Sequence, residues 1–348
     1  AWRGSLEYKT VLRKPWETLT APPTLLRELT RYAEARALVG GVTAIQGASA
    51  FYEDPEESLV RNVDLRIFGA HKARSRVDLD GRLMQERHKL RAAIDAREVN
   101  TFYIHVAEGP PSNERSRKEF EKLEAAGLLT EATVIIHGTA LTEDQLGRLR
   151  DVGGKLVWSP QSNLRLYGET TPAAEALALG IPLGLGADWL PSGSRSLLDE
   201  MRVARECLVL QEVGLSEPEL HRKLVHMVTV DAARIAGLED ELGRIAAGRP
   251  ADITVLERNF EDPWRNVVEA DPSRVELVTI DGFLVYGRAK WMDQVAPHPD
   301  MEPVIAWGKP MKLDTSFAVR ETGGPPVRLA TLRRQLLGRY MQTGPIFA

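Results

Sequence analysis

Short apolar segments alternate with amphipathic segments between residues 41 and 187, and this alternation restricts the folds open to the chain. Six of the apolar segments are predicted as strands, because they are short and rich in β-branched residues. They are Val42–Gln46, Val63–Phe68, Thr101–Val106, Thr133–Ile136, Lys155–Trp158 and Leu183–Leu185. Strands that are apolar on both faces and alternate with helices form parallel sheets covered by helices. The chain is therefore predicted to be an α/β protein, either a (β/α)8 barrel or a doubly wound sheet.

The segments between these strands have apolar residues at helical spacing. The predicted helices are Pro23–Leu38, Asp80–Arg97, Arg115–Ala126, Thr171–Leu179, Leu197–Leu210, Glu217–Val228 and Val230–Ala236. A further helix is predicted to begin at Thr142, which forms a capping-box pattern with Gln145.

Beyond residue 240 the sequence favours β structure. Val275–Ile280 and Phe283–Tyr286 flank an Asp-Gly pair, which is a strong signal for a β-hairpin. A basic helical stretch is predicted at Arg328–Tyr340. We therefore divide the chain into a barrel domain (1–240), a small β module (241–290) and a peripheral C-terminal tail (291–348).

Composition excludes several classes of protein. The 348 residues hold 45 Lys and Arg against 49 Asp and Glu, so no basic face for a nucleic acid is expected. The single cysteine, Cys207, excludes a disulfide framework and a cysteine-rich zinc site. No apolar run approaches the ~20 residues that span a bilayer. A cytoplasmic protein with a small-molecule substrate is expected, although a chain that starts at Ala1 leaves a removed signal peptide open.

Polar side chains follow four of the predicted strands, where parallel barrels place their active sites. His105 and Glu108 end one strand, His137 ends the next, Asn163 follows another, and Asp188 follows the last. Each of these polar strand ends alone is weak evidence for a functional site, since a lone histidine at a strand end is more often structural. Two imidazoles and a carboxylate that converge on one barrel mouth would suit Zn²⁺ or another divalent transition metal. The other five histidines are interpreted as structural, namely His71, His88, His221, His226 and His298.

These motifs resemble the amidohydrolase superfamily of metal-dependent (β/α)8 hydrolases, in the branch that holds cytosine, guanine and adenosine-type deaminases and triazine hydrolases. The resemblance covers roughly residues 39–290, in the order of the family's motifs. It is carried by Gly40–Ile45, His105–Glu108, Ile136–Gly138, Ser159–Asn163, Leu185–Asp188 and Gly243–Asp252.

The resemblance implies a role for each residue. His105, on the fifth barrel strand, would bind the metal, and Glu108 would shuttle a proton between the attacking water and the leaving nitrogen. His137 would orient the water, polarise the substrate or bind a second metal. Asp188, on the eighth strand, would bind the metal and act as a general base. Gly243–Asp252 would lead back into a small β-sandwich built from both chain ends.

The implied activity is hydrolysis of non-peptide carbon–nitrogen bonds, of deaminase or cyclic amidase type. Metal-activated water would attack a trigonal carbon, with zinc as the expected metal and iron or manganese as alternatives. A ring substrate could stack on Trp189 or form a hydrogen bond with Asn163. Arg165 and Ser192 could bind an anionic group of the substrate. Each of these four residues could equally be a packing or surface residue.

One departure from the family is large. Members carry a His-x-His pair at the end of the first strand, and here no histidine precedes His71. We interpret the chain as a TIM-like barrel that lacks its first strand, with remnants of the β-sandwich. The alternative is a non-catalytic barrel that binds a ligand or partner without turnover. A third possibility is another α/β fold in which the polar strand ends diverge. A homodimer is possible, because helical barrel exteriors often dimerise.

Overall fold

The computed structural model describes residues 5–47, 58–65, 67–69, 71–189, 191–295, 298–317 and 328–339. The chain forms two compact units, and each unit combines segments that are distant in sequence. The first holds Ala1–Asn62, Ala251–Val255 and Val275–Ala348, and the second holds Val63–Pro250 and Leu256–Arg274. The units are defined by which residues lie close together in space, so each contains separate stretches of the chain. The three consecutive domains expected from the sequence stay a prediction.

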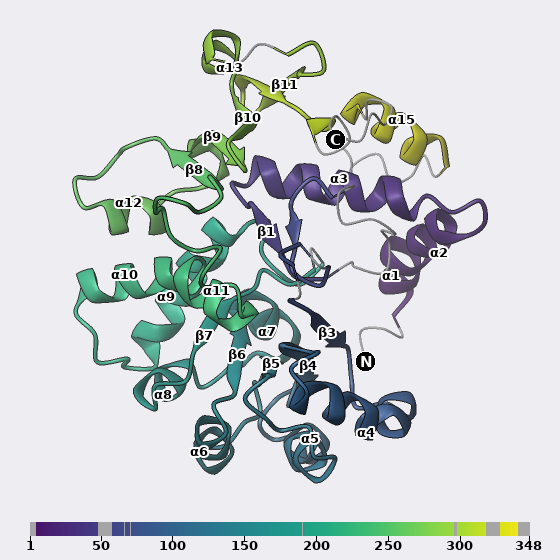
Figure 1. The fold of residues 1–348 in the computed structure, drawn as a ribbon, viewed down its shortest axis with the longest axis vertical. Helices are drawn as coiled ribbons and strands as arrows, with labels where there is room; N and C mark the ends of the chain where they lie inside the picture. Colours follow the sequence, from purple (N-terminus) through teal and green to yellow (C-terminus); the bar gives the residue numbers. More distant parts are fainter. Residues whose placement is uncertain are drawn as a thin grey trace. The chain divides into compact units, whose positions relative to one another are not determined.

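The second unit is built on a five-stranded parallel sheet (Figure 1). Its strands are β3 (Ala73–Arg76), β4 (Thr101–Val106), β5 (Thr133–His137), β6 (Lys155–Trp158) and β7 (Leu183–Leu185). Each strand pairs with the next one in the chain, in the order β3-β4-β5-β6-β7. A doubly wound sheet reverses its strand order, whereas a (β/α)8 barrel adds its strands in sequence. The strand order therefore agrees with the barrel prediction.

Helices cover the outer face of this sheet (Figure 1). They are α4 (Gly81–Asp95), α5 (Glu114–Ala125), α6 (Glu143–Asp151) and α8 (Ala173–Ala178). The predicted capping box at the start of α6 is confirmed. The Thr142 hydroxyl accepts a hydrogen bond from the Gln145 amide at 3.3 Å, and the Gln145 side chain accepts one from the Thr142 amide at 3.0 Å.

The remaining helices of the second unit are α7 (Pro160–Tyr167), α9 (Leu197–Leu210), α10 (Glu217–Met227), α11 (Val230–Ala236), α12 (Pro263–Val268) and the short η5 (Pro272–Arg274). Helix α7 follows β6 directly and was not predicted, because its eight residues are mostly polar and include turn-forming Ser and Asn. Pro160 occupies the first turn, where its missing N–H costs nothing, and Gly168 ends the helix with a φ of 73°. This unpredicted helix contributes much of the site described below.

The predicted strand Val63–Phe68 is wrong. Its described residues, 63–65, 67 and 68, form turns and irregular structure, and the strand is β3 instead. Val63 is buried, and Ile67 and Phe68 pack against the same core cluster. Their apolar pattern therefore reflects packing onto the sheet rather than membership of it. Only Ala73 is buried in β3, so this strand has no apolar pattern to recognise.

The first unit contains helices, a two-stranded parallel pair and an antiparallel sheet. Its helices are α1 (Leu6–Tyr8), a π-helical turn η2 (Lys9–Arg13), α2 (Lys14–Thr20), α3 (Leu26–Val39), α13 (Ala289–Val295) and α15 (Leu329–Arg339). The parallel pair is β1 (Ala44–Ile45) with β2 (Arg61–Asn62). The predicted basic helix is confirmed as α15, except for Tyr340, which lies outside the described residues. Its Leu336 packs with Leu19 and Tyr32, so segments from both chain ends share a small core.

The antiparallel sheet has the order β11-β12-β10-β9-β8. Its strands are β8 (Ile253–Leu256), β9 (Val275–Ile280), β10 (Phe283–Arg288), β11 (Glu302–Ala306) and β12 (Lys309–Leu313). The predicted hairpin is confirmed as β9 and β10, with positive φ at both residues of the Asp281-Gly282 turn. The sheet continues past residue 290, into the segment that the sequence predicts to be a peripheral tail. Two prolines concealed these strands, Pro303 in the edge strand β11 and Pro310 at a position of β12 that pairs only with β11.

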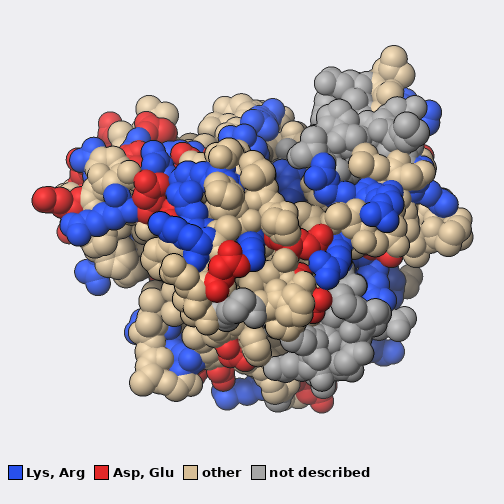
Figure 2. Space-filling model, turned by 90° about the horizontal axis from the view of Figure 1, so that it is seen from above, with Lys and Arg blue, Asp and Glu red and all other residues tan. Residues whose placement is uncertain are grey.

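Lys and Arg side chains are interspersed with Asp and Glu side chains on the face drawn in Figure 2. In the part of the chain that the structure describes, no helix combines the length and the apolarity that crossing a membrane requires.

Candidate metal and catalytic site

Three polar side chains meet at the carboxyl ends of β4 and β5. His105 lies on β4, Glu108 is the second residue after the end of that strand, and His137 is the last residue of β5. The two strands are in parallel register, with His105 opposite Ile136, so their ends are adjacent. Ala107 and His137 both have positive φ, at 55° and 70°. Left-handed backbone at non-glycine residues is strained and is concentrated at functional sites.

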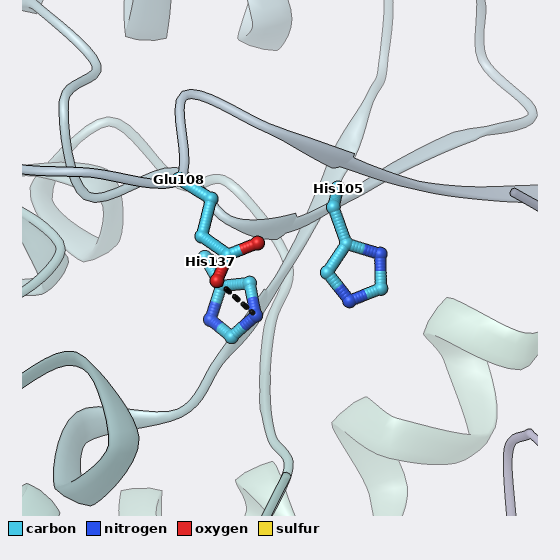
Figure 3. A group of neighbouring side chains, drawn as sticks. All are labelled: His105, Glu108 and His137. Carbon is cyan, nitrogen blue, oxygen red and sulfur yellow. Dashed lines mark ion pairs between the residues drawn. The ribbon is translucent and has the colours of Figure 1, made fainter. Parts of the chain in front are cut away.

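The ligand atoms of His105, Glu108 and His137 all lie within 4.8 Å of one another. The two imidazole rings have centroids 5.1 Å apart, and the Glu108 Oε1 atom lies 3.8 Å from His137 Nε2. Figure 3 shows the Glu108 carboxylate directed at the His137 ring, with the His105 ring beside them. His137 is 2% exposed and Glu108 is 28% exposed, so the carboxylate can be reached from solvent. Two imidazole nitrogens and a carboxylate oxygen are a donor set that fits zinc and similar divalent metals.

Burial lowers the pKa of His105, and the neighbouring His137 ring lowers it further. Its Nδ1 atom lies 3.4 Å from the Arg76 carbonyl oxygen. The imidazole is therefore held neutral, which is the form of histidine that binds metals.

A hydrogen-bonded chain fixes the tautomer of His137. The Asn163 amide nitrogen donates to the Thr171 hydroxyl at 3.1 Å, and that hydroxyl donates to the His137 carbonyl at 2.6 Å. The Asn163 oxygen is therefore the atom that faces His137 Nδ1, at 3.0 Å, and accepts its proton. The Nε2 lone pair then faces Glu108, and metal-binding histidines commonly donate their other ring N–H to a fixed acceptor in this way. Asn163 is fully buried, so it lies behind a predicted catalytic residue rather than on a surface open to substrate.

Asp188 follows β7 and also has a positive φ, at 57°. Its carboxylate accepts hydrogen bonds from the Ser162 hydroxyl at 2.5 Å and from the Trp189 amide at 2.7 Å. It is not part of the group of ligand atoms within 4.8 Å, although its charge raises the pKa of His105. The structure thus brings Glu108, rather than Asp188, together with the two histidines, and metal binding by Asp188 stays a prediction.

The other predicted substrate residues occupy different environments. Trp189 is 40% exposed beside Asp188, and Arg165 is exposed on α7. Ser192 is buried, and its hydroxyl lies 2.8 Å from the Ser162 hydroxyl. Trp189 is therefore the one of these three that combines exposure with a place next to a predicted site residue.

Sequence reasoning missed Tyr167, whose hydroxyl donates to Glu108 Oε1 at 2.6 Å. It is the last residue of α7, four positions after Asn163. Residues four apart share one face of a helix. A prediction of α7 as a helix would therefore have placed Tyr167 and Asn163 at the same site.

Sequence reasoning also missed Glu200, a fully buried carboxyl group in the first turn of α9. Its Oε1 atom accepts a hydrogen bond from the Gln161 amide at 3.0 Å. That amide is in the first turn of α7, where the N-cap residue Ser159 supplies no side-chain cap. Burial raises the pKa of Glu200 to about 7, with a smaller contribution from the charge of Asp188. Glu200 thus caps α7 from a neighbouring helix.

The titration of Glu200 predicts how stability depends on pH. Because the folded pKa of about 7 lies above the ordinary value of 4.5, the folded state binds more protons between these values. The free energy of unfolding should therefore fall by about 3 kcal/mol as the pH rises through this window. Glu200→Gln removes this titration, so urea denaturation at several pH values should show a flatter profile for the variant. Glu206→Gln, an exposed position on the same helix, is the control. Parallel profiles for wild type and Glu200→Gln would contradict the assignment.

The family model described as "Amidohydrolase family" matches residues 84–287, which is more than half of the chain. The chain belongs to the amidohydrolase family. The resemblance inferred from its motifs is therefore confirmed.

Curated relatives of this amidohydrolase include two enzymes named 5-methylthioadenosine/S-adenosylhomocysteine deaminase. The one from Desulforamulus reducens is 30% identical over 217 residues, which cover 58% of this chain and 48% of the relative. The one from Pyrococcus furiosus is 31% identical over 160 residues, which cover 44% of this chain and 37% of the relative. The matches thus span about half or less of the length of these relatives.

Solved structures share the fold at low sequence identity. An adenosine deaminase from Xanthomonas campestris with bound zinc has a TM-score of 0.67 and 17% identity, covering 95% of this chain and 80% of that one. The atrazine chlorohydrolase TrzN from Arthrobacter aurescens, complexed with zinc, has a TM-score of 0.62 and 20% identity, covering 80% and 76%. These likenesses establish a common architecture, and the third possibility of an unrelated α/β fold is wrong.

Proposed function

We propose that this amidohydrolase is a metal-dependent hydrolase of non-peptide carbon–nitrogen bonds, of deaminase or cyclic amidase type, with a small-molecule substrate. The observation that carries the proposal is the convergence of His105, Glu108 and His137 at the ends of adjacent parallel strands. The names of the relatives support a deaminase, and point to adenosine-like compounds as the first substrates to test.

His105 and His137 would hold the divalent metal, with Asp188 as the predicted further ligand. Zinc is the expected metal because two structural neighbours contain it, and iron or manganese are the alternatives. When bound, such an ion lowers the pKa of a water ligand to about 7 and supplies a nucleophile at neutral pH.

The side chains of this chain would manage the protons. Glu108 is exposed enough to meet a substrate and would carry a proton from the attacking water to the leaving nitrogen, so that ammonia departs as a C–O bond replaces the C–N bond. Asn163 would hold the Nδ1–H of His137, so that the ring presents Nε2 to the site. Asp188, held by Ser162, would act as the general base for the second proton of that water, which is lost as the carbonyl forms.

Zinc titration and ammonia release test the proposal. We expect the purified protein to bind Zn²⁺ in calorimetric titration and to release ammonia from at least one compound in a panel of aminopurine nucleosides, aminopyrimidines and aminotriazines. A chelator should abolish the release, and added Zn²⁺ should restore it. Zinc binding with neither ammonia release from this panel nor ring opening of cyclic amides would favour the alternative of a binding protein. Failure to bind any of Zn²⁺, Fe²⁺ or Mn²⁺ would contradict the metal site. The homodimer and the cytoplasmic location stay predictions.

Trp189 provides a test of substrate binding. If a ring substrate stacks on this half-exposed indole, Trp189→Ala should raise KM by about 2- to 10-fold and leave kcat nearly unchanged, since such contacts contribute about 0.5–1.5 kcal/mol. Trp291→Ala is a matched control, because Trp291 is 41% exposed and Trp189 is 40% exposed. An unchanged KM for Trp189→Ala would exclude stacking at this position.

A further inference from the structure

Helix α7 contributes hydrogen bonds to three of the site residues. Ser162 donates to Asp188, Asn163 accepts from His137, and Tyr167 donates to Glu108. The first two residues follow the start of the helix, and Tyr167 is one turn later on the face that carries Asn163. Tyr167 therefore reaches the site through the same rigid element that fixes the His137 tautomer.

The two oxygens of Glu108 have different surroundings. Oε1 accepts the Tyr167 hydroxyl at 2.6 Å and lies 3.8 Å from His137 Nε2. Oε2 has no hydrogen-bond partner among the residues that the structure describes. A phenol that donates to a carboxylate oxygen forms a short, charge-assisted bond, which is stronger than a bond between neutral groups. The Tyr167 hydroxyl thus holds Oε1 in place, and Oε2 is left to bind a proton.

We propose that Tyr167 is a positioning residue that fixes the rotamer of Glu108 and directs its proton-carrying oxygen, Oε2, to the substrate. This inference rests on the proposed role of Glu108 as the proton shuttle. Because Oε1 already accepts a hydrogen bond from the Tyr167 hydroxyl, the proton that Glu108 takes from water binds at Oε2. The same oxygen then delivers that proton to the leaving nitrogen, and Tyr167 retains its own proton throughout.

Tyr167→Phe removes the hydroxyl and keeps the ring. We expect kcat to fall about 10- to 100-fold, as for the loss of a hydrogen bond to a charged group, while KM changes less than about twofold. The fall should vanish when the same substitution is made in a Glu108→Gln background, because the effect acts through the carboxylate. Tyr286→Phe is the matched control, since the Tyr286 hydroxyl is buried in the first unit and has no hydrogen-bond partner among the described residues. It should leave kcat unchanged.

Infrared spectroscopy separates this inference from the proposed function. The carboxylate bands of Glu108 are identified by the difference between wild type and Glu108→Gln, and Tyr167→Phe should shift them. Unshifted bands, or a wild-type kcat in Tyr167→Phe, would overturn the positioning role. An equal fall of kcat in both backgrounds would also overturn it, because the effect would not pass through Glu108. Shifted bands in a protein that turns over no compound would contradict the proposed function while leaving the hydrogen bond intact.

Discussion

Glu108→Gln is expected to lower kcat by about 10²- to 10⁴-fold, the usual contribution of a general acid–base group. The amide has the shape of the carboxyl group and can still accept from Tyr167, but it cannot take up and release a proton. The side chain lies 3.8 Å from His137 and is partly exposed, so the substitution needs no rearrangement of the core. Ammonia release under saturating substrate gives kcat, and a zinc titration of the same sample reports the metal site.

The matched control is Glu114→Gln, which changes an exposed carboxylate paired with Lys118 at the start of α5. It should leave both kcat and zinc affinity unchanged. A kcat of Glu108→Gln within about threefold of wild type would remove Glu108 from the proton transfer. A loss of zinc affinity in this variant would instead make Glu108 a metal ligand, as its position within the ligand group permits.

Loss of a residue that hydrogen-bonds to a metal ligand weakens metal binding roughly 10- to 100-fold. His105→Ala removes a predicted ligand itself and should weaken zinc binding by more than this. Asn163→Ala should weaken zinc binding only about 10- to 100-fold, because Asn163 contacts His137 at Nδ1, the nitrogen that faces away from the cluster. Comparing the zinc affinities of the two variants therefore distinguishes a residue that binds the metal from one that only orients a ligand. Calorimetric titration with Zn²⁺ measures both affinities without any need for turnover.

His88→Ala is the control for this series, because His88 is exposed on α4 and lies outside the ligand group. Its zinc affinity should equal that of the wild type. Equal affinities for His105→Ala and wild type would show that the cluster is not the metal site. A greater loss in Asn163→Ala than in His105→Ala would reverse the assigned order of the two residues.

The strands β4 to β7 could be predicted from sequence because they are largely buried and stand out as mainly apolar runs. Their register then places His105 and His137 side by side, since the ends of neighbouring parallel strands meet. Strand β3 could not be found in this way, because three of its four residues are Arg or Ser. Its position is set by pairing with β4, which a local pattern does not encode.

The site was predicted less completely than the fold. The polar strand ends identified the two histidines and Glu108, but no local pattern revealed that Asn163 and Tyr167 share a helix. The choice between Glu108 and Asp188 as neighbour of the histidines depends on the backbone after each strand, where Ala107 and Asp188 adopt left-handed conformations. Such conformations are imposed by tertiary packing, and the type of residue at one position does not predict them.

Because one eight-residue helix restrains three separate groups of the site, selection cannot adjust those groups one at a time. A substitution of Pro160, which is buried in the first turn of α7, would act on the helix that carries Ser162, Asn163 and Tyr167 together. Changes at Pro160 should therefore show epistasis with changes at His137 and Glu108. Laboratory evolution toward a new substrate would meet this coupling first, and would gain most from altering the loop around Trp189 instead.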